Sequence, residues 1–503
     1  MLSALVLLGL ASTSQQRVVH TAQGSLAGAA DDGFVSYRGI PYGTVREINQ
    51  AGLAPSWAGN RESEKDSCSP TSAEQCLRLD VHVPTAPSAP VPVLAWVAGL
   101  GGHYHPGQLV RQGVIVVVVH HRLGPMGFAC TKEEQIPGNA GAKDVVSALR
   151  WVRDNIVAFN GNPANVVVGG QGFGAAIVEG LTLSPMAEGL FHGAIMQSGT
   201  ILSPWTFNYD AAERALALGR MFTNSDAVAS SLLKADFIDL ANKADQLNLP
   251  YYPFGMCAEK AFKREERFLS EPPFDSLSNH KVRSVPLMIG FNSNEGYIFA
   301  ATLIRLRILK RMTKDFNILL PEELKNLNER ELKQIKEMYF DGKINMSNVL
   351  AYHSDAYFVS HVHRSARLHA AASAQPVYYY QFSHPGAWGL EEEPGVPKTG
   401  AAHSDELALL FPDKGHALDG EDGDVQRTMI RLWTNFVKYF LTNKTKDISL
   451  TPETPRWEPT GVRADNLFEI GAGAAMRAFP HARASRLWDD LYERHYYNEL
   501  RNG

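Results

Sequence analysis

The glycine-rich turn from Gly170 to Gly174 is the segment of this sequence that most directly suggests chemistry. It reads G-Q-G-F-G, follows the apolar run Val166–Val168 and precedes a helical pattern. A strand, a G-x-S-x-G turn and a helix form a nucleophile elbow, which lifts a serine hydroxyl to the helix N-terminus where an oxyanion is also held. The central position here is Gly172. The turn therefore predicts the backbone of a nucleophilic site without its nucleophile.

The residues do not favour two other kinds of site, a nucleotide-binding loop and a metal site. A dinucleotide-binding loop reads G-x-G-x-x-G and lies in the first strand–helix unit, whereas here the third glycine comes one residue early. The histidines at 103, 105, 120 and 121 lie on different segments, without cysteine or carboxylate ligands at a zinc-like spacing. We therefore expect no metal and no cofactor.

The elements around the turn alternate between strand and helix. Val145, Val146, Leu149, Val152 and Ile156 recur at three- and four-residue steps, which predicts one apolar helix face within Ala142–Phe159. Short valine-rich runs predict strands buried on both faces. The expected order is strand Val91–Val97, strand Val114–Val119, helix Ala142–Phe159, strand Val166–Val168, helix Ala175–Leu183 and strand Ala194–Met196. This alternation predicts an α/β fold with a large, mostly parallel central sheet covered by helices on both faces.

Length and composition describe a folded chain. The 503 residues are 45% hydrophobic and 20% charged, which excludes disordered, collagenous and coiled-coil classes. No repeat or linker divides the chain, so one continuous domain from residue 15 to 503 is the simplest interpretation. The formal net charge of -5 gives no electrostatic reason to expect a nucleic acid partner.

Many separate segments resemble the type-B carboxylesterase (cholinesterase-like) family of α/β-hydrolases over nearly the whole chain. Phe34–Tyr42 resembles the family signature F-x-G-I-P-Y, and Glu74–Pro84 resembles E-D-C-L-x-L-N-V-Y-x-P. Further matching segments follow in the family's order: Val91–Gly101, Arg122–Phe128, Pro137–Asp144, Trp151–Phe159, Gly189–Gly199 and Leu487–Tyr492. Gln171, Pro253–Lys260 and Phe268–Pro272 resemble insect esterases, including those acting on juvenile hormone.

The resemblance implies positions for a catalytic triad. The acid falls on Glu295 within Gly290–Gly296, and the histidine falls on His403 within Gly400–Leu407. The nucleophile falls on Gly172, so the base and its orienting carboxylate are expected to be present without the group that they activate. Ser198, in the segment after the next strand, is interpreted as structural because relatives also carry a serine there.

The resemblance also implies an altered oxyanion hole, whose donors would come from the loop at Leu100 and Gly101 and from Phe173. Leu100 replaces a glycine and Phe173 replaces a small residue, so we expect added bulk at the reacting centre. Loss of a triad serine alone costs on the order of 10⁶ in rate, and each lost oxyanion donor about 10²–10³.

The N-terminus has the pattern of a secretory leader. The apolar run Leu2–Leu10 is followed by small residues, which predicts a signal peptide over residues 1–14 and a secreted, extracellular protein. A buried N-terminal segment is the alternative. The sequons at Asn345 and Asn443 are then candidate glycosylation sites. No other window has the ~18 apolar residues that span a bilayer, so we expect no transmembrane anchor.

The sequence contains four cysteines and one run of basic residues. Cys68 and Cys76 lie close together, and Cys76 matches a family cysteine that forms an N-terminal disulfide, so we expect these two to pair. Cys130 and Cys257 match no second family disulfide and are expected to be unpaired and buried. The basic run Arg305, Arg307, Lys310, Arg311 and Lys314 is interpreted as the solvated face of a helix.

The function predicted from these residues is binding rather than hydrolysis. Members of this family with an incomplete triad, the neuroligins and neurotactin among them, act in adhesion or recognition, which implies an unknown ligand or an extracellular protein partner. One alternative is a working carboxylic ester hydrolase in which His403 and Glu295 activate water directly, without serine. A gene copy under no functional constraint is a further alternative.

Overall fold

The computed structural model describes residues 17–45, 52, 54–62, 76–85, 89–99, 104–247, 253–263, 265–342, 344–386, 389–412, 418–439 and 455–497. The predicted signal peptide 1–14, Cys68, Leu100, Gly101 and Asn443 lie outside these residues.

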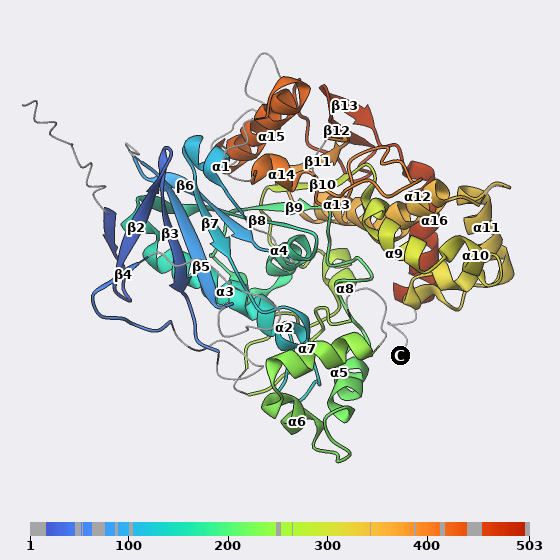
Figure 1. The fold of residues 1–503 in the computed structure, drawn as a ribbon, viewed down its shortest axis with the longest axis horizontal. Helices are drawn as coiled ribbons and strands as arrows, with labels where there is room; N and C mark the ends of the chain where they lie inside the picture. Colours follow the sequence, from blue (N-terminus) through green and yellow to red (C-terminus); the bar gives the residue numbers. More distant parts are fainter. Residues whose placement is uncertain are drawn as a thin grey trace, which may run out of the picture.

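A single large sheet runs through the molecule (Figure 1). Within the described residues it has 13 strands, in the spatial order β1-β2-β3-β5-β7-β6-β8-β9-β10-β11-β12-β13, with β4 paired to β2. The strands are β1 Arg17–His20, β2 Ser25–Asp31, β3 Phe34–Pro41, β4 Asn60–Glu62, β5 Arg78–Pro84, β6 Val91–Val97, β7 Ile115–Val119, β8 Gly161–Gln171, β9 Gly193–Gln197, β10 Leu287–Asn292, β11 Val377–Phe382, β12 Asn466–Ile470 and β13 Ala474–Ala478.

The central strands are parallel and the two ends of the sheet are antiparallel. β7, β6, β8, β9, β10, β11 and β12 pair in parallel, whereas β1, β2, β3 and β5 at one end and β13 at the other pair antiparallel. The short strand β4 pairs with β2 in parallel. Because parallel strands are connected by helices that cover both faces, their residues are buried on both sides. The predicted α/β fold is thus confirmed, and its parallel part is the centre of a mixed sheet.

Helices pack on both faces of this sheet (Figure 1). They are α1 Gly107–Arg111, α2 Gly124–Phe128, α3 Ala140–Asn155, α4 Phe173–Leu183, α5 Ala211–Arg220, α6 Val228–Lys234, α7 Phe237–Gln246, α8 Pro273–Ser278, α9 Ala300–Arg305, α10 Ile308–Met312, α11 Glu329–Tyr339, α12 Met346–Ser354, α13 Ser360–Ala372, α14 Leu407–Leu410, α15 Gly420–Tyr439 and α16 Ala482–Tyr492.

The hydrophobic core lies in two layers, one on each face. Alternate residues of β6 belong to different layers, since side chains alternate across a strand. Val93, Ala95 and Val97 pack with the apolar faces of α3 and α4. Leu94 and Trp96 pack on the opposite face with α15, where Trp433 and Phe436 are buried. The strands that carry the glycine-rich turn are therefore held rigidly from both sides.

The helix predicted over Ala142–Phe159 is α3, which ends at Asn155 and continues as a 3-10 turn to Phe159. The basic run does not form one helix: Arg305 ends α9, and Lys310 and Arg311 lie in α10. Lys314 follows the end of α10. Arg307, at φ +50°, separates the two helices, and the five basic residues are exposed.

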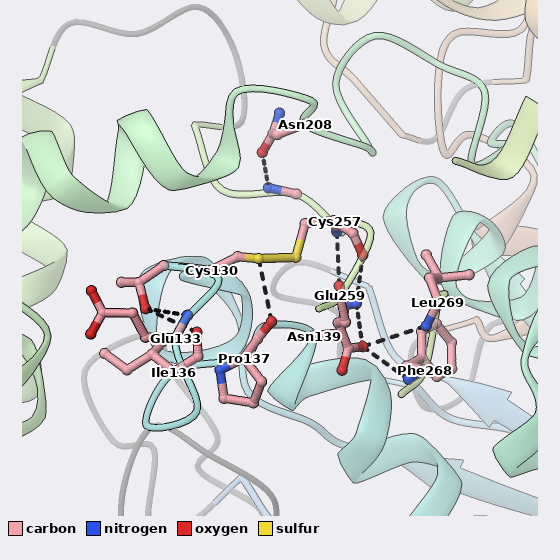
Figure 2. Close-up of a disulfide and its surroundings, with 12 residues drawn as sticks. Cys130, Glu133, Ile136, Pro137, Asn139, Asn208, Cys257, Glu259, Phe268 and Leu269 are labelled. Atoms are coloured by element: carbon pink, nitrogen blue, oxygen red, sulfur yellow. Dashed lines mark hydrogen bonds between the residues drawn. A yellow bond between two sulfur atoms is a disulfide. The ribbon is translucent and has the colours of Figure 1, made fainter. Parts of the chain in front are cut away.

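The prediction that Cys130 and Cys257 are unpaired is wrong, because they form a disulfide (Figure 2). The two cysteines are 127 residues apart and meet because Asn139 holds the segment around Cys257. The Asn139 side chain accepts from the Cys257 N–H at 2.9 Å and donates to the Cys257 carbonyl at 2.8 Å. A Cβ at Gly138 would lie 2.5 Å from the Cys257 sulfur, so glycine is needed there. Both cysteines are buried, as expected.

Cys76 also takes part in a disulfide, but its predicted pairing with Cys68 involves a residue outside those described. In the portion of the chain that the structure covers, no helix is long and apolar enough to cross a membrane.

Candidate active site

Gly172 lies at a sharp turn between a strand and a helix. β8 ends at Gln171, α4 begins at Phe173, and Gly172 between them has φ +57° and ψ -121°. This left-handed conformation is strained for any residue with a side chain, and it is the conformation in which an elbow presents its nucleophile. The Gly172 N–H donates to the Gln197 carbonyl at 2.8 Å. The turn thus has the strained backbone path of an elbow, with glycine at its tip.

Close packing fixes the path of the turn. A Cβ on Gly199 would lie 2.0 Å from the Gly172 carbonyl oxygen, so the chain after β9 crosses directly beneath the elbow. Since such a contact is shorter than real Cβ atoms allow, glycine at 199 is a geometric requirement of the elbow. Neighbouring Ser198 is fully buried at φ +53°.

His403 and Glu295 meet beside the turn, although 108 residues separate them in the sequence. The His403 Nδ1 lies 2.6 Å from the Glu295 Oε2. Glu295 follows β10 and is fully buried, and its other oxygen accepts from the Asn292 N–H at 2.7 Å. A carboxylate at this distance holds the proton of a neutral imidazole on Nδ1, which leaves the Nε2 lone pair available as a base.

The Nε2 side of this imidazole faces Gly172. A Cβ built on Gly172 would lie 3.1 Å from the His403 Nε2 and 3.6 Å from its Cε1. Among the described residues, no other non-neighbouring heavy atom lies within 4 Å of that Cβ. The fold thus brings together Gly172, His403 and Glu295, the positions predicted from the sequence as nucleophile, base and acid.

Gln171 takes part in the site in a way that the sequence did not reveal. Its Nε2 lies 3.1 Å from the His403 Nε2, and both side chains are buried. Because an amide nitrogen donates and does not accept, this contact directs an amide N–H at the lone pair of His403. His403 is therefore hydrogen-bonded on both ring nitrogens. The one signal in the sequence was a polar residue directly before the elbow.

Glu406 is a second buried carboxyl group behind the pair of His403 and Glu295. It accepts from the Gln197 Nε2 at 3.0 Å and from the Asn292 Nδ2 at 2.5 Å. Burial, and then the nearby charge of Glu295, raise the pKa of Glu406 to about 7. Its hydrogen bonds join the ends of β9 and β10 to the loop that carries His403. The only signal for Glu406 in the sequence is its place three residues after His403 in the same matched segment.

Aromatic rings surround the imidazole. The Phe358 ring centroid lies 4.8 Å from that of His403, and the Trp205 centroid lies 6.4 Å away in an edge-on arrangement. The Trp205 Nε1 donates to the Tyr357 carbonyl at 2.8 Å, which fixes the indole. The surroundings of His403 are therefore largely apolar, apart from Gln171 and the two carboxyl groups.

Of the three oxyanion-hole positions named from the resemblance, the structure describes Phe173. Its ring packs edge-on against Phe128 of α2, with centroids 4.9 Å apart, and the side chain is buried. In the loop before Leu100 and Gly101, the Gly99 N–H donates to the Tyr104 hydroxyl at 3.0 Å. One backbone donor of the glycine loop is thus used within the protein.

Comparison with known proteins identifies the family. The sequence profile of the Carboxylesterase family matches residues 15–488. The chain belongs to the carboxylesterase family. It is 30% identical to esterase FE4 of Myzus persicae over 438 residues, which cover 79% of this chain and 75% of that protein. It is 28% identical to juvenile hormone esterase of Heliothis virescens over 484 residues, with 85% and 86% covered.

A solved carboxylesterase-family structure shows the same fold. Juvenile hormone esterase from Manduca sexta, with OTFP covalently attached, superimposes with a TM-score of 0.82. The match covers 95% of this chain and 100% of that one, at 24% sequence identity. The family resemblance drawn from the sequence motifs is therefore confirmed, as is the α/β-hydrolase fold.

Proposed function

We propose that this carboxylesterase-family protein has lost ester hydrolysis and acts by binding a ligand or a protein partner. The observation that supports this proposal is the glycine at position 172. The backbone there has the strained conformation of a nucleophile elbow, but no side-chain hydroxyl extends from it toward the His403 Nε2. An acyl-enzyme intermediate needs a nucleophilic oxygen or sulfur at this point. With none, substrate is held without being cleaved.

The intact pair of His403 and Glu295 supports one second candidate. A water molecule beside the His403 Nε2 would be activated as a nucleophile by general-base catalysis, since Nδ1 is already oriented by Glu295 at 2.6 Å. The Gln171 amide opposes this route, because it occupies the lone pair that would take the proton from water. We therefore place binding first.

We also propose that the protein is secreted, as one domain over residues 15–503 after removal of residues 1–14. The disulfide between Cys130 and Cys257 supports an oxidising compartment, where such bonds form and persist. The sequon at Asn345 fits this proposal. Asn345 is exposed, and its Oδ1 caps α12 by accepting from the Asn348 N–H, so the amide nitrogen that would carry a glycan is not the capping atom.

The test is hydrolysis of p-nitrophenyl acetate by the wild-type protein and by Gly172→Ser. We expect the wild type to remain at the rate of a His403→Ala control. We expect Gly172→Ser to gain turnover by at least about 10², because it restores the missing member of a triad whose loss costs about 10⁶. Leu100→Gly, added to Gly172→Ser, tests the second altered position and should raise turnover further. Wild-type turnover that disappears in His403→Ala would establish the water mechanism instead.

A further inference from the structure

The turn between α9 and α10 places a dense group of cations at the surface. Four of the five residues of the basic run recur at steps of three and four: Arg307, Lys310, Arg311 and Lys314. The Lys310 and Arg311 N–H groups donate to the Arg307 carbonyl at 3.1 and 3.3 Å, so these residues share one face of a helical turn. The opposite face of α10 is buried. In Figure 1, α10 lies at the periphery of the molecule, at the opposite end from β4.

These cations have no acidic partners in the part of the chain that the structure describes. No ion pair or side-chain hydrogen bond is found there at any of the five basic residues. The neighbouring carboxylate of Asp315 accepts from the Asn317 N–H at 3.0 Å. By contrast, the next exposed lysines along the chain, Lys325 and Lys333, each pair with a glutamate. Because like charges three and four residues apart on a helix repel one another, an anionic partner would relieve this repulsion.

Two aliphatic side chains are exposed beside these cations. Ile304 is 38% exposed and Leu306 is 43% exposed, and they alternate with Arg305 and Arg307 in the sequence. Arg307 has φ +50°, a left-handed conformation that is strained for a residue with a side chain. The strained turn ends α9 and keeps apolar and cationic side chains together at the surface. This combination is typical of proteins that bind at the interface of a membrane.

The aliphatic residues determine which anionic partner fits best. An anionic phospholipid surface has negative head groups with hydrocarbon directly beneath them, so it matches both the cations and the apolar side chains. A sulfated polysaccharide matches the cations alone and leaves Ile304 and Leu306 against water or polar atoms.

The distribution of charge gives such a contact one orientation. The whole chain has a formal net charge of -5, whereas Arg305–Lys314 contains five basic residues and no acidic one. An anionic surface therefore attracts this segment and repels the net charge of the remainder. At physiological salt, charges further away than the Debye length of about 8 Å are largely screened, so the contacting segment dominates.

We propose that the basic run, together with Ile304 and Leu306, docks the protein onto an anionic phospholipid surface. The cations contact the head-group phosphates, and the two aliphatic side chains enter the boundary between head groups and hydrocarbon. No residue of the candidate active site takes part. The inference is therefore independent of the proposed loss of hydrolysis.

Sedimentation of the full-length protein with phospholipid vesicles tests the docking surface. We expect the wild type to sediment with vesicles of equal parts phosphatidylserine and phosphatidylcholine, and to stay in solution with phosphatidylcholine alone. Lys310→Gln/Arg311→Gln should weaken binding at least about tenfold, since each cation near an anionic surface contributes about fivefold. Lys325→Gln/Lys333→Gln is the matched control, because it removes two exposed lysines outside the docking surface, and should leave binding unchanged.

A variant that keeps every charge tests the apolar contact. Ile304→Ser/Leu306→Ser should weaken binding to the anionic vesicles at least about fourfold, the contribution of one buried CH₂ group. Thermal unfolding midpoints equal to that of the wild type show that the variants are folded.

The outcomes distinguish this inference from its alternatives. Equal binding to both kinds of vesicle, no binding to the anionic vesicles, or an equal loss in the control variant would overturn it. Retention on heparin without binding to vesicles would assign the basic run to a polysaccharide instead, and unchanged binding of Ile304→Ser/Leu306→Ser would remove the reason for preferring lipid. Turnover of p-nitrophenyl acetate by the wild type would contradict the proposed function without affecting the docking surface.

Discussion

A single backbone conformation explains why replacement of Gly172 has two opposing effects. At φ +57° and ψ -121°, glycine adopts the elbow at little steric cost. A serine there restores the hydroxyl but returns the strain of about 1–3 kcal/mol that such positions store. Activity and stability are thus expected to change in opposite directions at this residue.

We therefore expect Gly172→Ser to lower the free energy of unfolding by about 1–3 kcal/mol, while it gains esterase activity. Urea unfolding of the two proteins at one pH measures the difference. An unfolding free energy equal to or above that of wild type would show that the elbow is not strained for a side chain, contrary to its dihedral angles.

At the scale of elements, a buried ion pair joins α3 to the segment that follows β7. The Arg122 Nη2 donates to the Asp144 Oδ1 at 2.6 Å and its Nε to the Oδ2 at 2.8 Å, and both side chains are fully buried. The adjoining His121 contacts the Ala98 carbonyl at 3.0 Å, near the start of the glycine loop. The pair thus holds α3 against the strands that position the site.

Asp144→Asn should destabilise the protein by about 3–5 kcal/mol, because it leaves a buried guanidinium without its counter-charge. The same helix supplies a control in Asp154, which pairs with Arg153 at 2.7 Å with about half of each side chain exposed. Asp154→Asn should cost less than about 1 kcal/mol. Denaturant midpoints that shift equally in both variants would contradict the assigned role of burial.

The elements around the elbow were predictable because their patterns are local. Val91–Val97 is β6 at the predicted bounds, and the glycine-rich turn lies between a strand and a helix as expected. Two features depend on residues far apart in the chain and were not predictable from pattern. Cys130 pairs with Cys257 across 127 residues, and Gln171 reaches His403 across 232. Glu295 and His403 were located by family motifs, since spacing alone does not relate them.

At the scale of the whole molecule, several histidines are buried without their charge. Burial lowers the pKa of His82 and of His353 to about 4. Burial, followed by nearby arginine charges, lowers the pKa of His361 and of His363 to about 3. In the unfolded chain each of these groups titrates near about 6.5. The unfolded state therefore binds more protons than the folded state between about pH 6.5 and the folded pKa values.

It follows that these histidines contribute stability that is fully present above about pH 6.5 and falls as the pH drops toward 4, by about 1.4 kcal/mol per pH unit for each histidine. Glu406, whose pKa is raised to about 7, contributes in the opposite direction in this range. Urea unfolding between pH 7.5 and 4.5 measures this slope. In His353→Gln the slope should be smaller by one such contribution. A slope in His353→Gln equal to that of the wild type would show that this histidine is not held neutral in the fold.

The central claim is that an otherwise assembled carboxylesterase site lacks its nucleophile, and covalent labelling tests it most directly. The wild type and Gly172→Ser are incubated with a fluorophosphonate, which reacts with serine activated by the histidine and acid of a triad, and their intact masses are measured. We expect no adduct on the wild type and one adduct at position 172 of the variant, lost again in Gly172→Ser/His403→Ala. Labelling of the wild type at another residue would contradict the account, because the chain would then have an active nucleophile elsewhere.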